Sequence, residues 1–257
     1  MKRFPFLLLL LWTAAAATPA AAAAGTVFLL GGNALKGAVF AEALRPALRE
    51  SFHGRARVAL LLDAVHPEGH EAMEARLVAA FRDLGASAES LHRLDPAVKR
   101  ARLAEADGVF IVGGETFVLL AALHREGLLE VIRSRVRAGV PFAGSSAGAN
   151  VAGLVIGTTN DFPVTEIPSR AALGLVPVTV NPHHPAPSAA EEFRVRAGKI
   201  RGYLRFNPGE SVLGLGDASM ARWRDGELRL EAGFARLYRL NGETDLRPGE
   251  TVGGLVR

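Results

Sequence analysis

The sequence predicts an α/β fold, with a mainly parallel sheet covered by helices on both faces and a β-rich C-terminal end. Between residues 26 and 143, short apolar runs alternate with stretches of helical periodicity, which is the order of β-α-β units. These runs are continuously apolar, as is typical of strands buried on both faces. After residue 205, closely spaced runs without intervening helices replace this order.

Five runs are expected to form the parallel strands, and each is four to six residues long. The first run ends in Gly31-Gly32-Asn33, a composition typical of a turn. The run at residues 88–91 is the weakest of the five. The expected strands are Thr26–Leu30, Arg57–Leu62, Ala88–Leu91, Gly108–Val112 and Val140–Ala143.

Helices are expected between these strands. In the second of them, Leu77, Phe81 and Leu84 lie on one helical face, and Gly85 follows as a stop. The third begins with Pro96, which suits a first helical turn. The expected helices are Ala38–Phe52, Glu68–Leu84, Pro96–Ala106, Phe117–His124 and Leu128–Arg137.

The last third is expected to add strands around one helix. Met220–Trp223 and Glu227–Leu230 flank Asp225-Gly226, a strong signal for a β-hairpin. No linker rich in Pro, Gly or Ser and no internal repeat divides the chain, so residues 25–257 are expected to form a single domain. The other expected elements are the strands Val178–Val180, Val212–Leu215, Ala235–Leu240 and Thr251–Val256, and a helix over Ala189–Leu204.

The first residues have the pattern of a secretory signal peptide. Lys2 and Arg3 precede the apolar core Phe4–Trp12, and small residues follow up to Ala24. The core is too short for a spanning helix, which needs about 20 apolar residues. We therefore expect residues 1–24 to be a signal peptide, and the protein to be exported to a bacterial periplasm or secreted, a setting that agrees with the absence of cysteine.

Composition argues against several classes of function. Without cysteine, a thiolate metal site and a cysteine nucleophile are excluded. The net charge is +4, but without Lys2 and Arg3 the chain carries 28 basic and 26 acidic residues, interspersed rather than gathered in a stripe. No nucleic-acid partner is therefore expected. The segment Gly31-Gly32-Asn33 lacks the spacing of a phosphate or dinucleotide fingerprint, and neither a cofactor nor a metal is expected.

Residues 144–148, Gly-Ser-Ser-Ala-Gly, follow a predicted strand and match the G-x-S-x-G pattern of a nucleophile elbow. The pattern selects Ser146 as the nucleophile and leaves Ser145 pointing the other way. The amide of Ala147 would face an oxyanion, aided by the partial positive charge of a helix N-terminus.

A serine hydroxyl needs a base, and the base needs a group that orients it. Among the seven histidines, His183 stands out because it follows a predicted strand and prolines flank its segment, Asn181–Pro185. Ligands and catalytic groups gather at such strand ends in α/β sheets. Asp161, in a loop between Ser146 and His183, is the candidate acid, and the order Ser-Asp-His is that of the α/β-hydrolases.

These segments together resemble the peptidase E (α-aspartyl dipeptidase) and cyanophycinase family of serine peptidases. The match runs from about Gly108 to Leu204 and includes Gly-Gly-Glu-Thr-Phe at residues 113–117, where the family has Gly-Gly-Asn-Thr-Phe. The resemblance implies a flavodoxin-like, or class I glutamine-amidotransferase-like, three-layer sandwich rather than an α/β-hydrolase fold.

The resemblance also implies roles for individual residues. Ser146 would be the nucleophile, His183 the base and Asp161 the third member of a triad that acts through an acyl-enzyme. Gly114 would supply the second oxyanion donor beside Ala147. A possible homodimer is implied as well.

The substrate implied is a short peptide, with N-terminal aspartate as the family's preference. Arg196, in Arg194–Ile200, matches the arginine that recognises the aspartate carboxylate, since a guanidinium binds a carboxylate with two hydrogen bonds. Asn160 and Glu115 are expected to contact the substrate. Glu115 departs from the family's Asn, and a carboxylate there would repel an acidic group or bind a free α-amine. Predicted export is a second departure, because the family's dipeptidases are mostly cytoplasmic.

Three alternatives stay open. One is a cyanophycinase-like hydrolase of a β-aspartyl-arginine polymer, which would use the same triad. Another is an α/β-hydrolase esterase, although His183 lies only 37 residues after Ser146 and no histidine follows His184. The third is a peptide-binding module of the same fold without catalysis.

Overall fold

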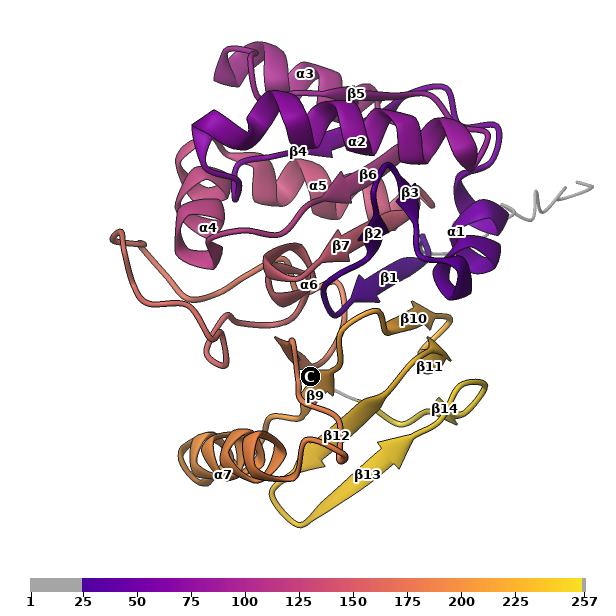
Figure 1. Cartoon of the computed structure of the whole chain (residues 1–257). Helices are drawn as coiled ribbons and strands as arrows, with labels where there is room; N and C mark the ends of the chain where they lie inside the picture. Colours follow the sequence, from indigo (N-terminus) through magenta and orange to yellow (C-terminus); the bar gives the residue numbers. More distant parts are fainter. Residues whose placement is uncertain (1–24, 256–257) are drawn as a thin grey trace, which may run out of the picture.

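The computed structural model describes residues 25–255, so the predicted signal peptide and the end of the last predicted strand lie outside the described residues (Figure 1). The larger of its two principal sheets has eight strands. The parallel strands are β1 (Val27–Leu30), β4 (Val58–Leu61), β5 (Ala88–Ser90), β6 (Gly108–Ile111) and β7 (Phe142–Ser145). The antiparallel strands are β10 (Met220–Arg224), β11 (Glu227–Ala232) and β14 (Thr251–Val252). Their order is β14-β11-β10-β1-β7-β6-β4-β5.

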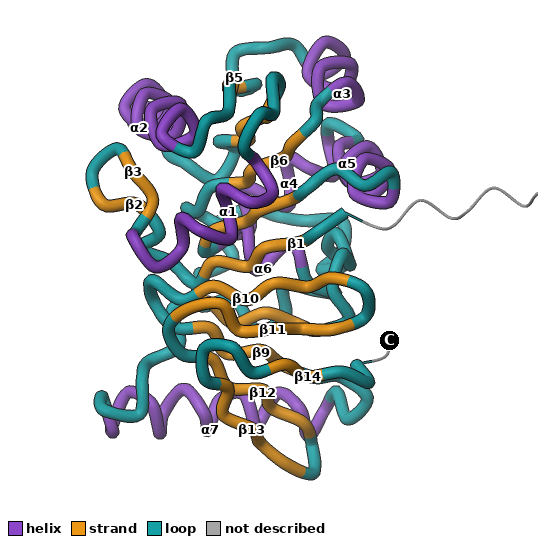
Figure 2. The backbone as a smooth tube through the Cα atoms, turned by 90° about the vertical axis from the view of Figure 1, so that its right-hand side faces the viewer, coloured by secondary structure: helices purple, strands orange, loops and turns teal. Residues whose placement is uncertain are grey.

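Helices cover both faces of this sheet, so the molecule has the predicted three-layer α/β arrangement (Figure 2). One face is covered by α1 (Arg45–Phe52) and α2 (His70–Asp83). The other is covered by α3 (Pro96–Glu105), α4 (Thr116–Arg125), α5 (Leu128–Arg137) and α6 (Ala147–Ala152). This confirms the predicted fold class.

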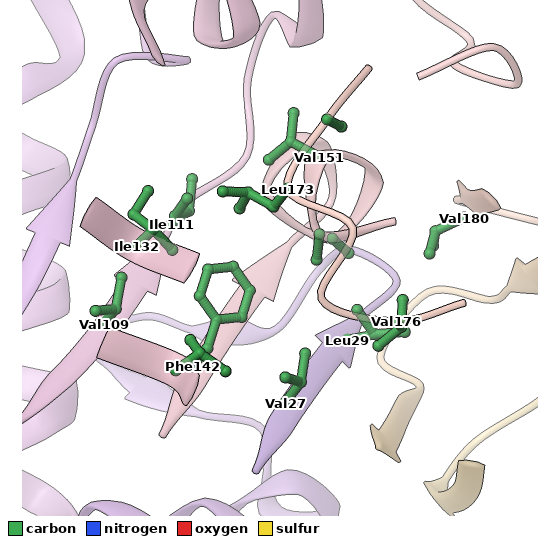
Figure 3. Packing of buried hydrophobic residues seen from close by; sticks show 14 of the residues in the cluster. Val27, Leu29, Val109, Ile111, Ile132, Phe142, Val151, Leu173, Val176 and Val180 are labelled. Atoms are coloured by element: carbon green, nitrogen blue, oxygen red, sulfur yellow. The ribbon is translucent and has the colours of Figure 1, made fainter. Parts of the chain in front are cut away.

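Successive side chains along each strand point to opposite faces of the sheet, so each strand contributes to both halves of the core. Phe28 and Leu30 of β1 pack in the cluster beneath α1 and α2, whereas Val27 and Leu29 pack in the cluster beneath α4 and α5. Figure 3 shows the second cluster, where Phe142 lies among aliphatic side chains from the neighbouring strands and helices. Continuously apolar strands are needed because both of their faces are buried.

The C-terminal part builds a second sheet of four strands, in the order β13-β12-β9-β8. Its helix, α7 (Ala190–Phe206), packs Ala197, Ile200 and Leu204 against Val212 and Tyr238. The strands are β8 (Thr179–Pro182), β9 (Val212–Leu215), β12 (Ala235–Arg239) and β13 (Gly242–Leu246). The β-rich end is thus confirmed.

The Asp-Gly hairpin is confirmed in detail. Arg224 of β10 pairs with Glu227 of β11, and the two residues between them have positive φ, 51° at Asp225 and 84° at Gly226. Positive φ at both central residues is the type I′ geometry that joins antiparallel strands most readily.

Two local predictions were wrong. The predicted helix begins at Ala38, but residues 38–40 belong to a small hairpin of β2 (Leu35–Lys36) and β3 (Val39–Phe40). Gly37 makes the turn with φ of 63°, and Phe40 is buried in the core, so tertiary packing overrides local helix propensity. The strand β13 was not predicted, because Leu246 is its one buried residue and it has no apolar pattern.

The carboxyl ends of the parallel strands lie on the same side of the main sheet, and the second sheet contacts the main sheet there. The backbone N–H of His183, directly after β8, donates to the carbonyl of Gly31, directly after β1, with an N–O distance of 3.0 Å. Residues after β1, β6, β7 and β8 therefore converge. Within residues 25–255, no helix combines the length and apolar character needed to cross a membrane.

Candidate active site

Ser146 lies on a strained turn between β7 and α6. Its φ of 54° and ψ of −115° are sparsely populated for a residue with a side chain. The turn needs small neighbours: a Cβ on Gly144 would lie 2.3 Å from the carbonyl oxygen of Gly148, and a Cβ on Gly148 would lie 2.1 Å from that of Ile111. These contacts explain the two glycines of the G-x-S-x-G pattern and leave the Ser146 hydroxyl at the tip of the elbow.

The Ser146 hydroxyl meets His183, as the sequence predicts. Ser146 Oγ lies 2.7 Å from His183 Nε2. His183 follows β8 with a φ of 53°, a conformation that turns its ring back toward the end of β7. The two residues are 37 positions apart in the chain and are brought together by the junction of the two sheets.

Asp217 is the acid bonded to the histidine. His183 Nδ1 lies 2.6 Å from Asp217 Oδ1. An ionised carboxylate is only an acceptor, so this contact keeps the proton on Nδ1 and leaves Nε2 free to accept the serine proton. Asn33 Nδ2 donates to Asp217 Oδ2 at 2.8 Å and fixes the carboxylate.

The glycine loop after β1 is shaped around this pair. A Cβ on Gly32 would lie 2.1 Å from His183 Cε1 and 2.6 Å from Asp217 Oδ1. Gly32 also has a φ of 146°, which favours glycine. The segment that the sequence suggested as a simple turn thus contacts both the base and the acid.

The structure does not bring Asp161 to the histidine, so the predicted third member is corrected. Asp161 Oδ2 accepts a hydrogen bond from the backbone N–H of Thr116, at 2.8 Å. Thr116 is the first residue of α4, and a carboxylate is stabilised at a helix N-terminus by unbonded N–H groups and the helix dipole. Asp161 therefore lies beside the candidate oxyanion loop with Glu115, the exposed N-cap of α4.

Two backbone amides flank the serine. Ala147 begins α6, and Gly114 follows β6 with a φ of 145°. A Cβ on Gly114 would lie 1.9 Å from the carbonyl oxygen of Ala64, which also accepts from the amide of Glu115 at 2.8 Å. Within residues 25–255, neither the Gly114 amide nor the Ala147 amide donates to another protein group. Both are available to an oxyanion.

Arg196 and Asn160 lie behind the histidine segment. Arg196 Nη1 donates to Asn181 Oδ1 at 3.0 Å and to the carbonyl oxygens of Pro182 and His183 at 3.4 Å. Asn160 Nδ2 donates to the Pro182 carbonyl at 3.0 Å. Burial lowers the pKa of Arg196, and among the described residues it has no carboxylate partner. Arg196 and Asn160 also line one small pocket of about 120 Å³.

His184 points away from the serine. It is buried, with Nε2 at 2.8 Å from the Tyr238 hydroxyl and Nδ1 at 2.8 Å from the Pro185 carbonyl oxygen. Burial lowers its pKa to about 4, so the ring is neutral at pH 7. In the described part of the chain, no group of three His, Asp or Glu side chains is arranged to hold a metal.

Asp217 and the Gly31–Asn33 loop were missed by sequence reasoning. Asp217 comes two residues after β9, just as His183 comes directly after β8. A polar residue at a strand end was the signal that identified His183, and the same signal applies to Gly216-Asp217. Asp161 was selected instead because it lies in a loop between Ser146 and His183 in the sequence, in the order of the α/β-hydrolases.

Curated relatives of high similarity are peptidases. The chain is 41% identical to peptidase E of Streptomyces coelicolor over 181 residues, 69% of either chain. It is 35% identical to a probable alpha-aspartyl dipeptidase of Drosophila melanogaster over 224 residues, 85% of this chain and 92% of that one.

These relatives overturn the predicted export. They are peptidase E proteins and an α-aspartyl dipeptidase, the group that the resemblance describes as mostly cytoplasmic. The segment on which export rested, residues 1–24, lies outside the described residues. The prediction of a periplasmic or secreted protein is therefore wrong.

Solved structures agree on the fold. A peptidase from an acI-B1 actinobacterium superposes with a TM-score of 0.68 at 18% identity, covering 91% of this chain and 98% of that one. A putative peptidase E from Listeria monocytogenes gives a TM-score of 0.62 at 20% identity, with 81% and 98% covered. The model of peptidase family S51 matches residues 27–231. The chain belongs to peptidase family S51 and is a serine-type dipeptidase similar to peptidase E.

Proposed function

We propose that this dipeptidase hydrolyses dipeptides with a free amino terminus, prefers aspartate there, and uses Ser146, His183 and Asp217 through an acyl-enzyme. The observation that carries the proposal is the row of two short hydrogen bonds, 2.7 Å from Ser146 to His183 and 2.6 Å from His183 to Asp217. The row ends beside two amides that have no partner in the described part of the chain.

In the acylation step, Ser146 Oγ adds to the peptide carbonyl carbon while its proton passes to His183 Nε2. The carbonyl oxygen becomes an oxyanion, which the amides of Gly114 and Ala147 stabilise. Removal of one such donor typically costs about 3–4 kcal/mol of transition-state stabilisation. The C–N bond then breaks, and His183 gives its proton to the leaving amine.

In the deacylation step, a water molecule replaces the amine. His183 takes a proton from the water, the hydroxide adds to the acyl carbon, and the bond to Ser146 breaks as the serine regains its proton. Asp217 stays ionised throughout and stabilises the charged imidazolium that forms twice in each cycle.

The proposed amino-terminal side of the site carries groups of both signs. Arg196 has no carboxylate partner in the described part of the chain, which supports a role in binding the aspartate side chain. Glu115 and Asp161 adjoin the Gly114 loop and supply negative charge for a free α-amine. A homodimer, implied by the resemblance, stays a prediction for analytical ultracentrifugation.

The test compares Asp-Leu, Asn-Leu and Gly-Leu as substrates of wild type, Ser146→Ala and Arg196→Gln. We expect Ser146→Ala to lower kcat/KM by at least about a thousandfold. We expect Arg196→Gln to reduce the preference for Asp-Leu over Asn-Leu by about tenfold or more, the scale of a lost charge-assisted hydrogen bond.

Because Arg196 also contacts the carbonyl of His183, the ratio of two substrates, rather than activity on one, is the informative readout. Equal turnover of Asp-Leu and Gly-Leu by wild type would refute the aspartate preference. Release of Asp-Arg from cyanophycin in the absence of dipeptide hydrolysis would favour the polymer hydrolase. No turnover of any of these by wild type would favour a binding module.

A further inference from the structure

A pocket of about 230 Å³ opens on one side of Ser146, and the proposed function assigns no part of the substrate to it. Ser146, His183 and Gly114 form its inner wall, so it touches the nucleophile, the general acid and an oxyanion donor together. Its outer wall comes from α2 and from the segment leading into the β2–β3 hairpin. These elements lie on one face of the main sheet, opposite α3 and α5 (Figure 2).

The proposed amino-terminal side lies on the other face. Asp161 contacts the first residue of α4, and Asn160 lines the pocket that also holds Arg196. A dipeptide whose first residue occupies that side must direct its second residue across the serine, toward α2. A second cavity, lined by His183, Asp217 and Phe234, touches neither Ser146 nor the oxyanion glycines, so it does not reach the scissile bond.

The outer wall of the α2 pocket has the chemistry of a single amino-acid residue with a free carboxylate. Leu35, Met73 and Phe110 are apolar, and Arg76 is the one permanent charge among the described residues that line it. Arg76 Nε donates to the carbonyl oxygen of Gly37 at 2.8 Å, which fixes the side chain. Its terminal nitrogens make no ion pair with any carboxylate of residues 25–255, and the side chain is half-buried.

The size of the pocket agrees with this assignment. Sites for drug-sized ligands range from about 300 to 1,000 Å³. At about 230 Å³, this pocket accepts one residue rather than a longer peptide. A guanidinium at its rim is suited to a carboxylate, which it binds through two parallel hydrogen bonds.

We infer that this pocket binds the leaving residue of the substrate and that Arg76 binds its C-terminal carboxylate, which restricts the enzyme to dipeptides. The inference rests on the proposed dipeptidase function and adds a specificity-determining residue on the leaving side. In a dipeptide, the C-terminal carboxylate lies one residue from the scissile bond, within reach of Arg76. In a tripeptide, a neutral peptide bond lies there instead. The apolar wall and its single cation bind such a group weakly.

The experiment measures kcat/KM for Asp-Leu and for its C-terminal amide, which differ only in the charge that Arg76 would bind. The enzymes are wild type, Arg76→Gln, Arg76→Lys and, as a matched control, Arg82→Gln, an exposed arginine on the same helix. Thermal melting establishes that each variant is folded.

We expect wild type to favour Asp-Leu over the amide by about tenfold or more, the scale of a charge-assisted hydrogen bond. In Arg76→Gln, the ratio should fall to about one, mainly through loss of Asp-Leu hydrolysis, while Arg76→Lys keeps part of it. Arg82→Gln should keep the wild-type ratio. An unchanged ratio in Arg76→Gln, with Asp-Leu still hydrolysed, overturns this inference alone. Failure of wild type to hydrolyse either substrate overturns the proposed function as well.

Discussion

The long loop between α6 and β8 and the short turn between β9 and β10 each bring an aspartate to the same edge of the main sheet. Asp161 lies in the long loop and bonds to the amide that begins α4. Asp217 lies in the short turn and bonds to His183. The two carboxylates are chemically alike, so the difference in their contacts comes from the segments that carry them.

The short turn is fixed from both sides. The two strands that flank it belong to different sheets. Its backbone is also bonded to the glycine loop after β1: the Gly31 amide donates to the Ser219 carbonyl at 3.1 Å, and the Ala218 amide donates to the Gly32 carbonyl at 2.8 Å. These hydrogen bonds fix the position of Asp217, and an acid that orients a catalytic imidazole must be held to within about 0.5 Å.

The long loop holds its aspartate differently. The Asp161 carboxylate accepts from the Thr116 amide at the start of a helix, at 2.8 Å, and the Asp161 backbone N–H donates to Thr159 Oγ1 at 3.2 Å. Residues in such loops commonly bind ligands, because a loop tolerates change in its sequence and shape. We therefore propose that Asp217 orients the base and that Asp161 contacts the substrate.

The largest effect is expected for Asp217→Asn. An amide at this position no longer stabilises the imidazolium and permits the wrong tautomer of His183, so kcat for Asp-Leu should fall by about a thousandfold or more. The measurement is steady-state kinetics with purified enzyme, with melting temperature as the control for folding. A loss below tenfold would remove Asp217 from the catalytic role.

A smaller but large effect is expected for Gly32→Ala. The added methyl would lie 2.1 Å from His183 Cε1 and must displace the ring from Ser146. Since a misplacement of about 1 Å can cost about a hundredfold in rate, we expect a loss of that order in kcat. Gly226→Ala, in the turn between β10 and β11, is the matched control, because φ is positive there too but no atom lies within 4 Å of the added Cβ. Equal losses in the two variants would attribute the effect to backbone strain alone.

Short-range patterns account for what the sequence predicted correctly. Ser146 lies in a five-residue pattern, residues 144–148, that joins a strand end to a helix start, and His183 directly follows an apolar run, so each was visible in its own segment. Asp217 also follows an apolar run, but its bond to His183 depends on β9 pairing with β8 and on the contact of the second sheet with the first, and no local pattern encodes that contact. The β2–β3 hairpin was missed for a related reason, because burial of Phe40 against Phe81 and Phe110 outweighs local propensity.

A moderate effect is expected for Asp161→Asn. The amide oxygen still accepts from Thr116, so the loop keeps its place, but the negative charge is lost. If Asp161 helps to bind the α-amine, kcat/KM for Asp-Leu should fall by about tenfold, mainly through KM. A loss as large as that of Asp217→Asn, carried by kcat, would instead show that Asp161 acts in catalysis together with Ser146 and His183.

The last expected effect concerns stability near the Asp217 turn rather than activity. His184 packs against β9, where a Cβ on Gly214 would lie 2.4 Å from its ring, and its amide donates to the Leu215 carbonyl at 3.0 Å. Its pKa is about 4 in the folded protein, below the ordinary value of 6.5. The unfolded chain therefore binds the proton more readily, so the contribution of His184 is fully present above pH 6.5 and is lost as the pH falls toward 4.

Urea unfolding of wild type and His184→Gln at pH 7.5 and 4.5 measures this contribution. We expect wild type to lose about 2 kcal/mol more than the variant between these two pH values, because each unit of pKa difference corresponds to about 1.4 kcal/mol. Tyr238→Phe is the control: it removes the hydrogen bond to His184 but keeps the ring buried, so its loss on acidification should resemble that of wild type. Parallel losses in wild type and His184→Gln would mean that acid acts on the turn through other groups.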